Sequence, residues 1–309
     1  MDKIRTAIVG PGNIGSDLMY KILDRGQKVS LEAMVGIYPV EQSEGLQAAQ
    51  ANGVDVGTDG IASVRAIADD VDLVFEATSA KIHESHAPTY DELGLFAVDM
   101  TPAAVGPFVA PTVNIDALSE DVMNVNMITC GGQATIPIVN AIDQVSSVHY
   151  AEIIATISSD SAGPGTRQNI DEFTQTTAAG LEEVGGADNA KAIIVLNPAE
   201  PPILNRCTIY TQVADGTDLD AVRESVSRMA ETIQSYVPGY KLTLEPMVKH
   251  DLGVELEESE VITTMVEVEG EGQHLPEYAG NLDIMTSAAL GTAERLATNW
   301  TERAEGVVR

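Results

Sequence analysis

Two stretches of this chain combine residue types and spacing that can do chemistry, and one of them is centred on a cysteine. Cys130 follows an apolar, strand-like run (residues 125–129) and precedes Gly131 and Gly132. A thiol between a strand and a helix can have its pKa lowered by the helix N-terminus, and nearby backbone amides can stabilise an oxyanion. We interpret the two glycines as exposing backbone to a ligand. The pattern therefore predicts a cysteine nucleophile, with a buried structural cysteine as the alternative.

The other stretch is a glycine-rich turn that lies between a β-rich run (residues 4–9) and a helical stretch (residues 16–24). Its spacing is that of a dinucleotide-binding turn, in which the first glycine allows a tight bend and the second lets backbone approach a pyrophosphate. The third glycine allows close packing of the helix on the strand. A glycine turn without a ligand is the alternative. The predicted cofactor-binding residues here are Gly10, Pro11, Gly12, Asn13, Ile14 and Gly15.

The end of the second predicted strand (residues 31–37) indicates which dinucleotide is used. An acidic residue commonly holds the ribose 2′-hydroxyl of NAD at this point, but here the position carries Tyr38, and Glu41 and Glu44 follow. No arginine lies nearby in the sequence to hold the 2′-phosphate of NADP. The sequence therefore favours NAD.

A second loop of small residues lies at a later strand-to-helix junction. Such a loop can contact a cofactor or a substrate, and a plain connection is the alternative. The candidate residues are Ser161, Ala162, Gly163, Pro164, Gly165, Thr166, Arg167, Gln168 and Asn169.

The elements that must position these residues follow two patterns along the chain. In the first pattern, strand-like runs alternate with helix-length segments, which predicts βαβ units and a doubly wound parallel sheet. In the second, longer strands of alternating polarity surround two helices, which predicts an α+β lobe with a mostly antiparallel sheet. The last helix is amphipathic and is expected to fold back on the first domain. The first set of runs is 4–9, 31–37, 71–77, 95–99 and 125–129; the second is 149–158, 191–196, 207–213, 240–244 and 261–268, with helices at 169–184, 219–236 and 281–299.

Composition limits the possible partners. The chain has 309 residues and a formal net charge of −30, from 17 basic and 47 acidic residues. Such a surface should repel nucleic acid and anionic lipid. The chain lacks an 18-residue apolar run and a signal-peptide pattern, and its two cysteines form neither a disulfide framework nor a metal-binding motif. We expect a cytoplasmic enzyme without a metal site, and we interpret the acidity as adaptation to salt, with an ordinary acidic enzyme as the alternative.

Several motifs carry a resemblance to one family. The Cys130 motif, the turn at residues 12–15 and the loop at residues 161–169 resemble those of the acylating acetaldehyde dehydrogenases of the meta-cleavage pathway, and the resemblance extends almost from end to end. The other matching motifs are Asp99-Met100-Thr101-Pro102-Ala103, Asn197-Pro198-Ala199-Glu200-Pro201-Pro202 and Tyr278-Ala279-Gly280-Asn281-Leu282-Asp283-Ile284-Met285.

This resemblance implies an activity, a fold and partners. It implies oxidation of acetaldehyde, or of a short aldehyde such as propanal, to acyl-coenzyme A with NAD, through a thiohemiacetal and a thioester on Cys130. It adds Asn281 to the cofactor site. It implies aromatic hydrocarbon catabolism and a channelling complex with 4-hydroxy-2-oxovalerate aldolase, as a homodimer within a heterotetramer. The implied fold is that of glyceraldehyde-3-phosphate and aspartate-semialdehyde dehydrogenases: a dinucleotide-binding domain (1–131), an α+β catalytic and dimerisation domain (132–278) and a returning C-terminal helix (279–309).

Two departures from the family pattern leave alternatives open. Tyr38 replaces the aspartate of a Gly-Ile-Asp-Pro motif, and Cys207 replaces an aspartate thought to help activate the nucleophile. Cys207 is a benign replacement, a weak acid, a redox partner of Cys130, the mark of a divergent enzyme or a structural residue. The alternative functions are a semialdehyde or acyl-phosphate reductase, for which Arg167 and Arg206 are the few cationic candidates, and a non-catalytic NAD-binding subunit of an aldolase complex.

Overall fold

The computed structural model describes residues 3–163, 166–167, 170–248 and 259–304. The chain divides into one unit made of residues 1–127 and 285–309 and a second unit made of residues 128–284. The domains expected from the sequence end at residues 131 and 278. In the described ranges, no helix is both long enough and apolar enough to cross a membrane.

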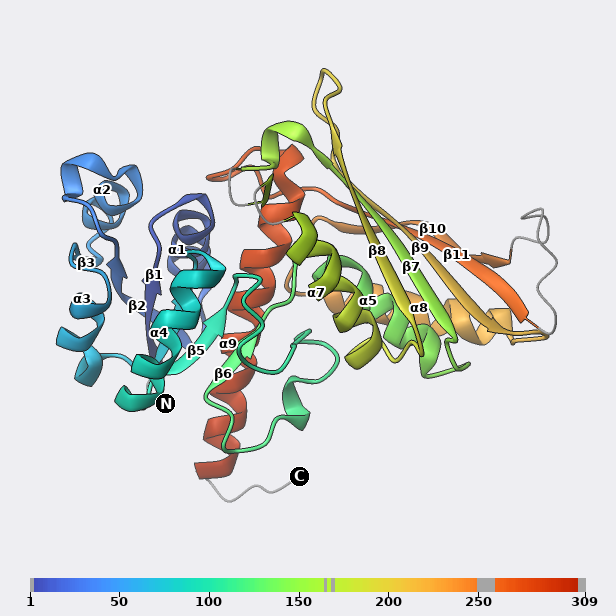
Figure 1. The fold of residues 1–309 in the computed structure, drawn as a ribbon, viewed down its shortest axis with the longest axis horizontal. Helices are drawn as coiled ribbons and strands as arrows, with labels where there is room; N and C mark the ends of the chain where they lie inside the picture. Colours follow the sequence, from blue (N-terminus) through green and yellow to red (C-terminus); the bar gives the residue numbers. More distant parts are fainter. Residues whose placement is uncertain (1–2, 164–165, 168–169, 249–258, 305–309) are drawn as a thin grey trace. The chain divides into compact units, whose positions relative to one another are not determined.

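The first unit contains a six-stranded parallel sheet with the strand order β3-β2-β1-β4-β5-β6 (Figure 1). This is the doubly wound arrangement that the alternation of strands and helices predicted. The order reverses between β1 and β4, and ligands of such sheets bind at the carboxyl ends of the strands beside this point. The strands are β1 (Ile4–Val9), β2 (Val29–Val35), β3 (Asp55–Gly57), β4 (Leu73–Glu76), β5 (Phe96–Asp99) and β6 (Asn124–Asn126).

The central strands of this sheet are buried because both faces are covered. One apolar cluster contains Ala7 of β1, Val35 of β2, Val74 of β4 and Tyr90, which are almost inaccessible to solvent. Parallel strands covered on both sides are expected to be apolar almost throughout. The helices of this part of the chain are α1 (Asn13–Arg25), α2 (Glu44–Ala51), α3 (Ile61–Ala66) and α4 (Ala80–Leu93).

The C-terminal helix α9 (Gly280–Ala304) contributes its residues from Met285 onward to the first unit. The Glu294 carboxylate accepts hydrogen bonds from the backbone N–H groups of Gln27 and Lys28. Arg295 makes a two-point ion pair with Asp116, at 2.6 Å for each nitrogen–oxygen pair. These contacts bind the end of the chain to elements near its beginning.

The second unit contains a five-stranded sheet with the order β10-β11-β9-β7-β8, in which only β7 and β8 pair in parallel. The mostly antiparallel sheet expected from the sequence is therefore present. Helices α5, α7 and α8 contact its strands, and Figure 1 shows them along one face of the sheet. The elements are α5 (Cys130–Asp143), β7 (Tyr150–Ser158), α7 (Ile170–Glu183), β8 (Ala190–Asn197), β9 (Asn205–Ala214), α8 (Leu219–Gln234), β10 (Tyr240–Val248) and β11 (Ser259–Val268).

The segment before Cys130 differs from the expected strand. Strand β6 ends at Asn126, not at residue 129, and Ile128 has a φ of +63°. A β-branched residue rarely adopts this left-handed conformation, because its side chain crowds the backbone. The turn at Ile128 therefore ends the strand, and Thr129 becomes the residue that precedes α5.

Candidate active site

The glycine turn after β1 has three glycines in three different environments. Gly10 has a φ of +108°, and a Cβ added there would lie 2.5 Å from the carbonyl oxygen of Ala77. A Cβ added to Gly15 would lie 2.0 Å from the carbonyl oxygen of Gly10. Nothing lies within 4 Å of a Cβ added to Gly12. The first and third glycines therefore allow a bend and close packing, whereas the second presents its backbone to open space.

The N-terminus of α1 completes this turn. The helix begins at Asn13, no side chain in the described structure caps it at Gly12, and its first turn carries no acidic residue. Backbone N–H groups at an uncapped helix N-terminus favour an anion such as a pyrophosphate. The residues present therefore fit the dinucleotide that the sequence predicts.

A buried polar cluster adjoins the same turn at the ends of β4 and β5. Glu76 accepts hydrogen bonds from the hydroxyl groups of Thr78 and Tyr90, and its carboxylate lies 3.0 Å from Nδ1 of His86. Burial raises the pKa of Glu76, but these partners and His83 outweigh burial and lower it to about 2. Because Ala77 and Thr78 lie against Gly10, this anchored carboxylate holds the segment on which the glycine turn packs.

His83 lies between two buried carboxylates of this cluster. Its Nδ1 is 3.8 Å from Glu76, and its Nε2 is 3.6 Å from Asp99. Burial lowers the pKa of His83, but the two acids outweigh burial and raise it. Burial raises the pKa of Asp99 to about 6. His83 and Glu76 are not among the residues predicted from the sequence, and Asp99 appears there only within a family motif. A glutamate and an aspartate at the carboxyl ends of neighbouring strands are the signal that could have indicated them.

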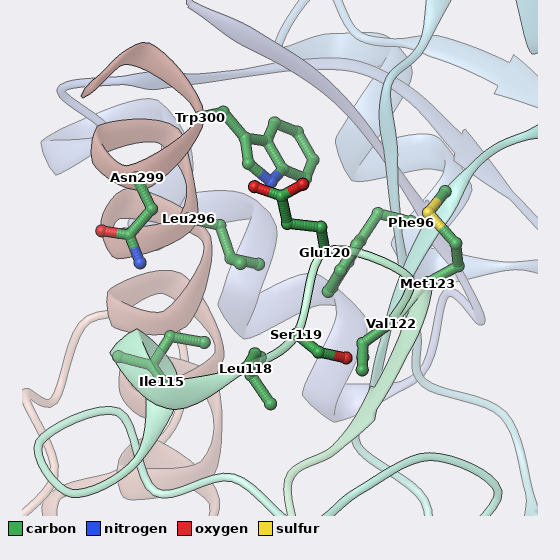
Figure 2. A pocket seen from close by; sticks show the side chains of 10 residues that line it. All are labelled: Phe96, Ile115, Leu118, Ser119, Glu120, Val122, Met123, Leu296, Asn299 and Trp300. Carbon is green, nitrogen blue, oxygen red and sulfur yellow. The ribbon is translucent and has the colours of Figure 1, made fainter. Parts of the chain in front are cut away.

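An apolar pocket of about 110 Å³ lies elsewhere in the first unit, next to the end of α9 (Figure 2). Phe96 and Trp300 line it, with their ring centroids 5.6 Å apart. Phe96 is the first residue of β5, whereas the glycine turn follows the last residue of β1. In a parallel sheet the first residue of one strand and the last residue of another lie at opposite ends of the strands. The pocket is therefore separate from the glycine turn.

Cys130 is the first residue of α5, and Thr129 caps this helix. The Thr129 hydroxyl oxygen accepts a hydrogen bond from the Gly132 N–H at 2.9 Å and lies 2.6 Å from the Thr177 hydroxyl. Thr177 in turn donates to the carbonyl oxygen of Phe173. This chain of hydrogen bonds fixes the residue next to Cys130. The sequence analysis did not select Thr129, although a threonine directly before a helix is a common capping signal.

The two glycines after Cys130 do not expose backbone, which corrects the interpretation made from the sequence. Both are buried. A Cβ added to Gly131 would lie 2.8 Å from Cζ of Phe173, and one added to Gly132 would lie 2.9 Å from Cγ2 of Ile128. These glycines are needed for close packing of the first turn of α5 against its neighbours.

The pKa of the Cys130 thiol is raised, which corrects the expectation that the helix N-terminus lowers it. Burial raises this pKa to about 11, although hydrogen bonds from the backbone N–H groups of Gly131 and Cys130 act in the opposite direction. Removal from water disfavours the thiolate more than the two amides favour it. The amides nevertheless point at the sulfur on which a negative charge would develop.

Cys207 lies on the buried side of β9, within electrostatic range of Cys130. It is 2% exposed, and its thiol is 3.8 Å from Oδ1 of Asn205. Burial, followed by the proximity of Cys130, raises the pKa of Cys207 far above its ordinary value. Burial therefore disfavours the thiolate form of Cys207.

The small-residue loop is described only in part, because Pro164, Gly165, Gln168 and Asn169 lie outside the described residues. Ser161 and Ala162 are buried, and the Ser161 hydroxyl donates to the carbonyl oxygen of Ser158. The Arg167 guanidinium donates to the carbonyl oxygens of Ala162 and Ser159. Arg167 thus supports the loop that contains Ser161, Ala162, Gly163 and Thr166.

Asn281 lies in the first turn of α9 and is 1% exposed. Its Oδ1 atom has no hydrogen-bond partner among the residues that the structure describes. Buried amide oxygens are rarely left without a donor.

The predicted residues fall into two groups. Gly10 to Gly15 belong to the first unit, whereas Cys130, the described part of the 161–169 loop and Asn281 belong to the second. No group of three or more histidine, cysteine, aspartate or glutamate side chains in the described part of the chain is suited to hold a metal ion. The glycine turn thus lies in one unit and the half-buried Cys130 in the other.

Comparisons with known proteins agree on one family. Residues 130–276 match the protein-family model described as "Prokaryotic acetaldehyde dehydrogenase, dimerisation". The chain is 52% identical to an acetaldehyde dehydrogenase of Carboxydothermus hydrogenoformans, covering 96% of this chain and 94% of that one. It is 53% identical to an acetaldehyde dehydrogenase of Bacillus cereus, covering 100% and 99%.

A solved structure shares the fold. The aspartate semialdehyde dehydrogenase II of Vibrio cholerae has a TM-score of 0.64 with this chain, at 13% sequence identity, covering 96% of this chain and 99% of that one. The agreement extends over both units and includes the parallel sheet and the mixed sheet. The sequence had predicted this fold class.

Proposed function

Because this chain belongs to the acetaldehyde dehydrogenase family, a group of aldehyde oxidoreductases, we propose that it converts acetaldehyde, NAD and coenzyme A to acetyl-coenzyme A and NADH. Other short aldehydes, such as propanal, fall within the proposal. The observation that carries it is Cys130, placed as the first residue of α5 with two backbone N–H groups directed at its sulfur.

Cys130 acts as the nucleophile of the proposed reaction. Its sulfur, as the thiolate, bonds to the aldehyde carbon and forms a thiohemiacetal. The N–H groups of Cys130 and Gly131 stabilise the negative charge on this sulfur. Oxidation of this adduct leaves an acetyl thioester on Cys130. The thiol of coenzyme A then takes the acetyl group and returns Cys130 to its free form.

The nicotinamide cofactor, when bound, accepts the hydride that the aldehyde carbon loses. Gly10 to Gly15 would hold its pyrophosphate, because Gly12 faces open space and α1 begins without a cap. Ser161, Ala162, Gly163, Thr166 and Asn281 are the second group of proposed cofactor residues. The free acceptor of Asn281 supports this assignment.

The rate of NADH formation, measured with and without coenzyme A, tests the proposal. Purified chain should form NADH from acetaldehyde and NAD only when coenzyme A is present, in 0.1 M and in 2 M KCl. With coenzyme A withheld, mass spectrometry should find one acetyl group on the peptide that contains Cys130, and none in the Cys130→Ala variant. NADH formation at the same rate without coenzyme A, or by Cys130→Ala, would contradict the proposed mechanism.

We propose that the chain is a homodimer and that the uncovered face of its second sheet forms the interface. The matched family model describes a dimerisation module. Thr156, Val195, Thr208 and Met265 share this face. Thr156 pairs with Val195 and Met265 with Thr208, and Thr208 also pairs with Ile154, which lies two residues before Thr156 on the same face of β7. Val195 and Met265 are each 39% exposed, and exposed apolar side chains that gather on one face mark interaction surfaces.

The molar mass of the protein in solution, measured by light scattering, tests this proposal. The double variant Val195→Asp/Met265→Asp should be a monomer, because it would bury two carboxylates in the interface. Val145, 38% exposed and outside the sheet, provides the control: Val145→Asp should remain a dimer. A wild-type chain that is monomeric at micromolar concentration would contradict the proposal.

The resemblance also supports an aldolase partner. We propose that the dimer binds 4-hydroxy-2-oxovalerate aldolase, which supplies the aldehyde. Mixing the two purified proteins and measuring the mass of the complex by light scattering tests this. Separate peaks for the two proteins at micromolar concentrations would contradict it.

A further inference from the structure

The end of β2 lacks the side chain that usually reads the ribose of a dinucleotide. A carboxylate at this point accepts hydrogen bonds from the ribose hydroxyl groups and repels a 2′-phosphate. Here the strand is followed by Gly36, Ile37 and Tyr38, and Ile37 and Tyr38 are 70% and 57% exposed. A neutral phenol supplies neither the charge nor the two acceptors of a carboxylate.

The sequence around this point is nevertheless acidic. Residues 32–64 contain no lysine or arginine and five acidic residues. Among these, Glu41, Glu44 and Asp59 are exposed. The five acidic residues are Glu32, Glu41, Glu44, Asp55 and Asp59.

Backbone contacts place two of these acids beside the nucleotide turn. Gly45 follows Glu44, and a Cβ added to Gly45 would lie 2.2 Å from the carbonyl oxygen of Pro11. Asp59 precedes Gly60, whose N–H donates to the carbonyl oxygen of Gly36 at 2.9 Å. The N-terminus of α2 and the segment before α3 thus both adjoin the end of β2.

The basic side chains of the neighbouring helices α1 and α3 are engaged in ion pairs. Lys21 of α1 is buried and bonds to Asp17. Arg65, in the last turn of α3, pairs with Glu92. These two basic side chains are therefore not directed at a phosphate at the end of β2.

We propose that this chain discriminates between NAD and NADP by repulsion between the 2′-phosphate and the carboxylates of Glu41, Glu44 and Asp59, and not by a hydrogen bond to the ribose from position 38. The proposal rests on the nucleotide site of the proposed function. It assigns a specificity role to residues outside the glycine turn.

Repulsion at a distance and a hydrogen bond respond differently to salt. A phosphate monoester carries nearly two negative charges at neutral pH. Its repulsion by charges that are not in contact is screened over about 10 Å at 0.1 M salt and about 3 Å at 1 M salt. A direct hydrogen bond is short and is not screened in this way. The preference for NAD should therefore be about tenfold at 0.05 M KCl and at most about twofold at 2 M KCl.

Fluorescence titration of the full chain with NADH and with NADPH measures the ratio of dissociation constants at the two salt concentrations. A ratio that falls as stated supports the proposal, and an unchanged ratio overturns it while leaving the proposed function intact. If neither nucleotide binds at either salt concentration, the proposed cofactor is wrong, and this inference fails with it. Circular dichroism at both concentrations verifies that the chain is folded.

Variants separate the two kinds of discrimination. Tyr38→Asp restores a carboxylate at the strand end and should give a preference of at least tenfold that persists in 2 M KCl. Tyr38→Phe removes only the hydroxyl and should leave the ratio unchanged at both salt concentrations. A ratio that falls to one in Tyr38→Phe at low salt would show that the tyrosine reads the ribose and would overturn the proposal.

Neutralising the carboxylates tests their location. Glu41→Gln/Glu44→Gln should reduce the low-salt ratio to about threefold or less. The matched control is Asp69→Asn/Asp70→Asn, which removes the same charge from exposed residues that precede β4, at the amino ends of the strands. If the control lowers the ratio as much, the effect belongs to the net charge of the chain, and the assignment to Glu41 and Glu44 is overturned.

Discussion

The chain contains two turns that join a strand to a helix through glycine, and the glycines serve different purposes. After β1, Gly12 has open space where a side chain would be, so its backbone is left uncovered. Before α5, Gly131 and Gly132 are buried against Phe173 and Ile128. The first turn leaves backbone open, and the second brings α5 close against its neighbours.

This difference extends to electrostatics. The helix after the first turn begins uncapped and without an acidic residue, which leaves its positive end for an anion. The helix after the second turn is capped by Thr129, and its first side chain is the thiol itself. Similar glycine patterns can therefore leave backbone open or allow close packing, and the surroundings of each glycine decide which.

The largest expected effect concerns the pH dependence of Cys130. Because thiols react as thiolates and burial raises this pKa to about 11, alkylation of the ligand-free chain by iodoacetamide should accelerate about 500-fold between pH 8 and pH 11. The Cys207→Ala variant leaves one thiol and makes the reading unambiguous, and Cys130→Ala is the unreactive control. A rate that reaches its plateau below pH 9 would show that the helix N-terminus outweighs burial.

Next in size is the effect of a side chain at Gly12. Gly12→Val should weaken NADH binding at least tenfold, because the branched side chain occupies the surface that the pyrophosphate approaches. The midpoint of thermal unfolding should change little, since nothing lies within 4 Å of an added Cβ. Unchanged NADH affinity, measured by fluorescence titration, would argue against a nucleotide at this turn.

Gly131→Ala should produce the opposite pair of results. Its Cβ would lie 2.8 Å from Cζ of Phe173, and overpacking of this kind costs about 1–3 kcal/mol. Denaturant unfolding should show this loss, with NADH affinity unchanged. Adding Phe173→Leu removes the atom in conflict and should recover part of the stability; no recovery would place the strain elsewhere.

The smallest effect concerns the cap of α5. Thr129→Ala should cost about 1 kcal/mol of folding free energy, because the Gly132 N–H loses its acceptor. Thr129→Ser keeps the hydroxyl and should lose less than half of that amount. Equal losses in the two variants would mean that the methyl group, and not the hydrogen bond, matters at this position.

The sequence predicted the glycine turn well because its requirements are local. The spacing of Gly10, Gly12 and Gly15 between a strand and a helix already implies a bend, an open backbone and close packing, and each glycine has that environment. The same local reasoning did not hold at Cys130. The pKa of its thiol depends on how much protein covers it, and the glycine pair depends on Phe173, a residue far along the chain.

The sequence by itself determined the alternation of strands and helices, the two sheet types, the family and the single thiol preceding a glycine pair. These features follow from periodicity and from residues adjacent in the chain. The tertiary structure alone decided that Cys130 is covered strongly enough to raise its pKa, and that Glu44 and Asp59 lie beside the end of β2. It also showed that Glu76 and Asp99 share a buried histidine. Burial and proximity between distant residues depend on packing, which no local pattern specifies.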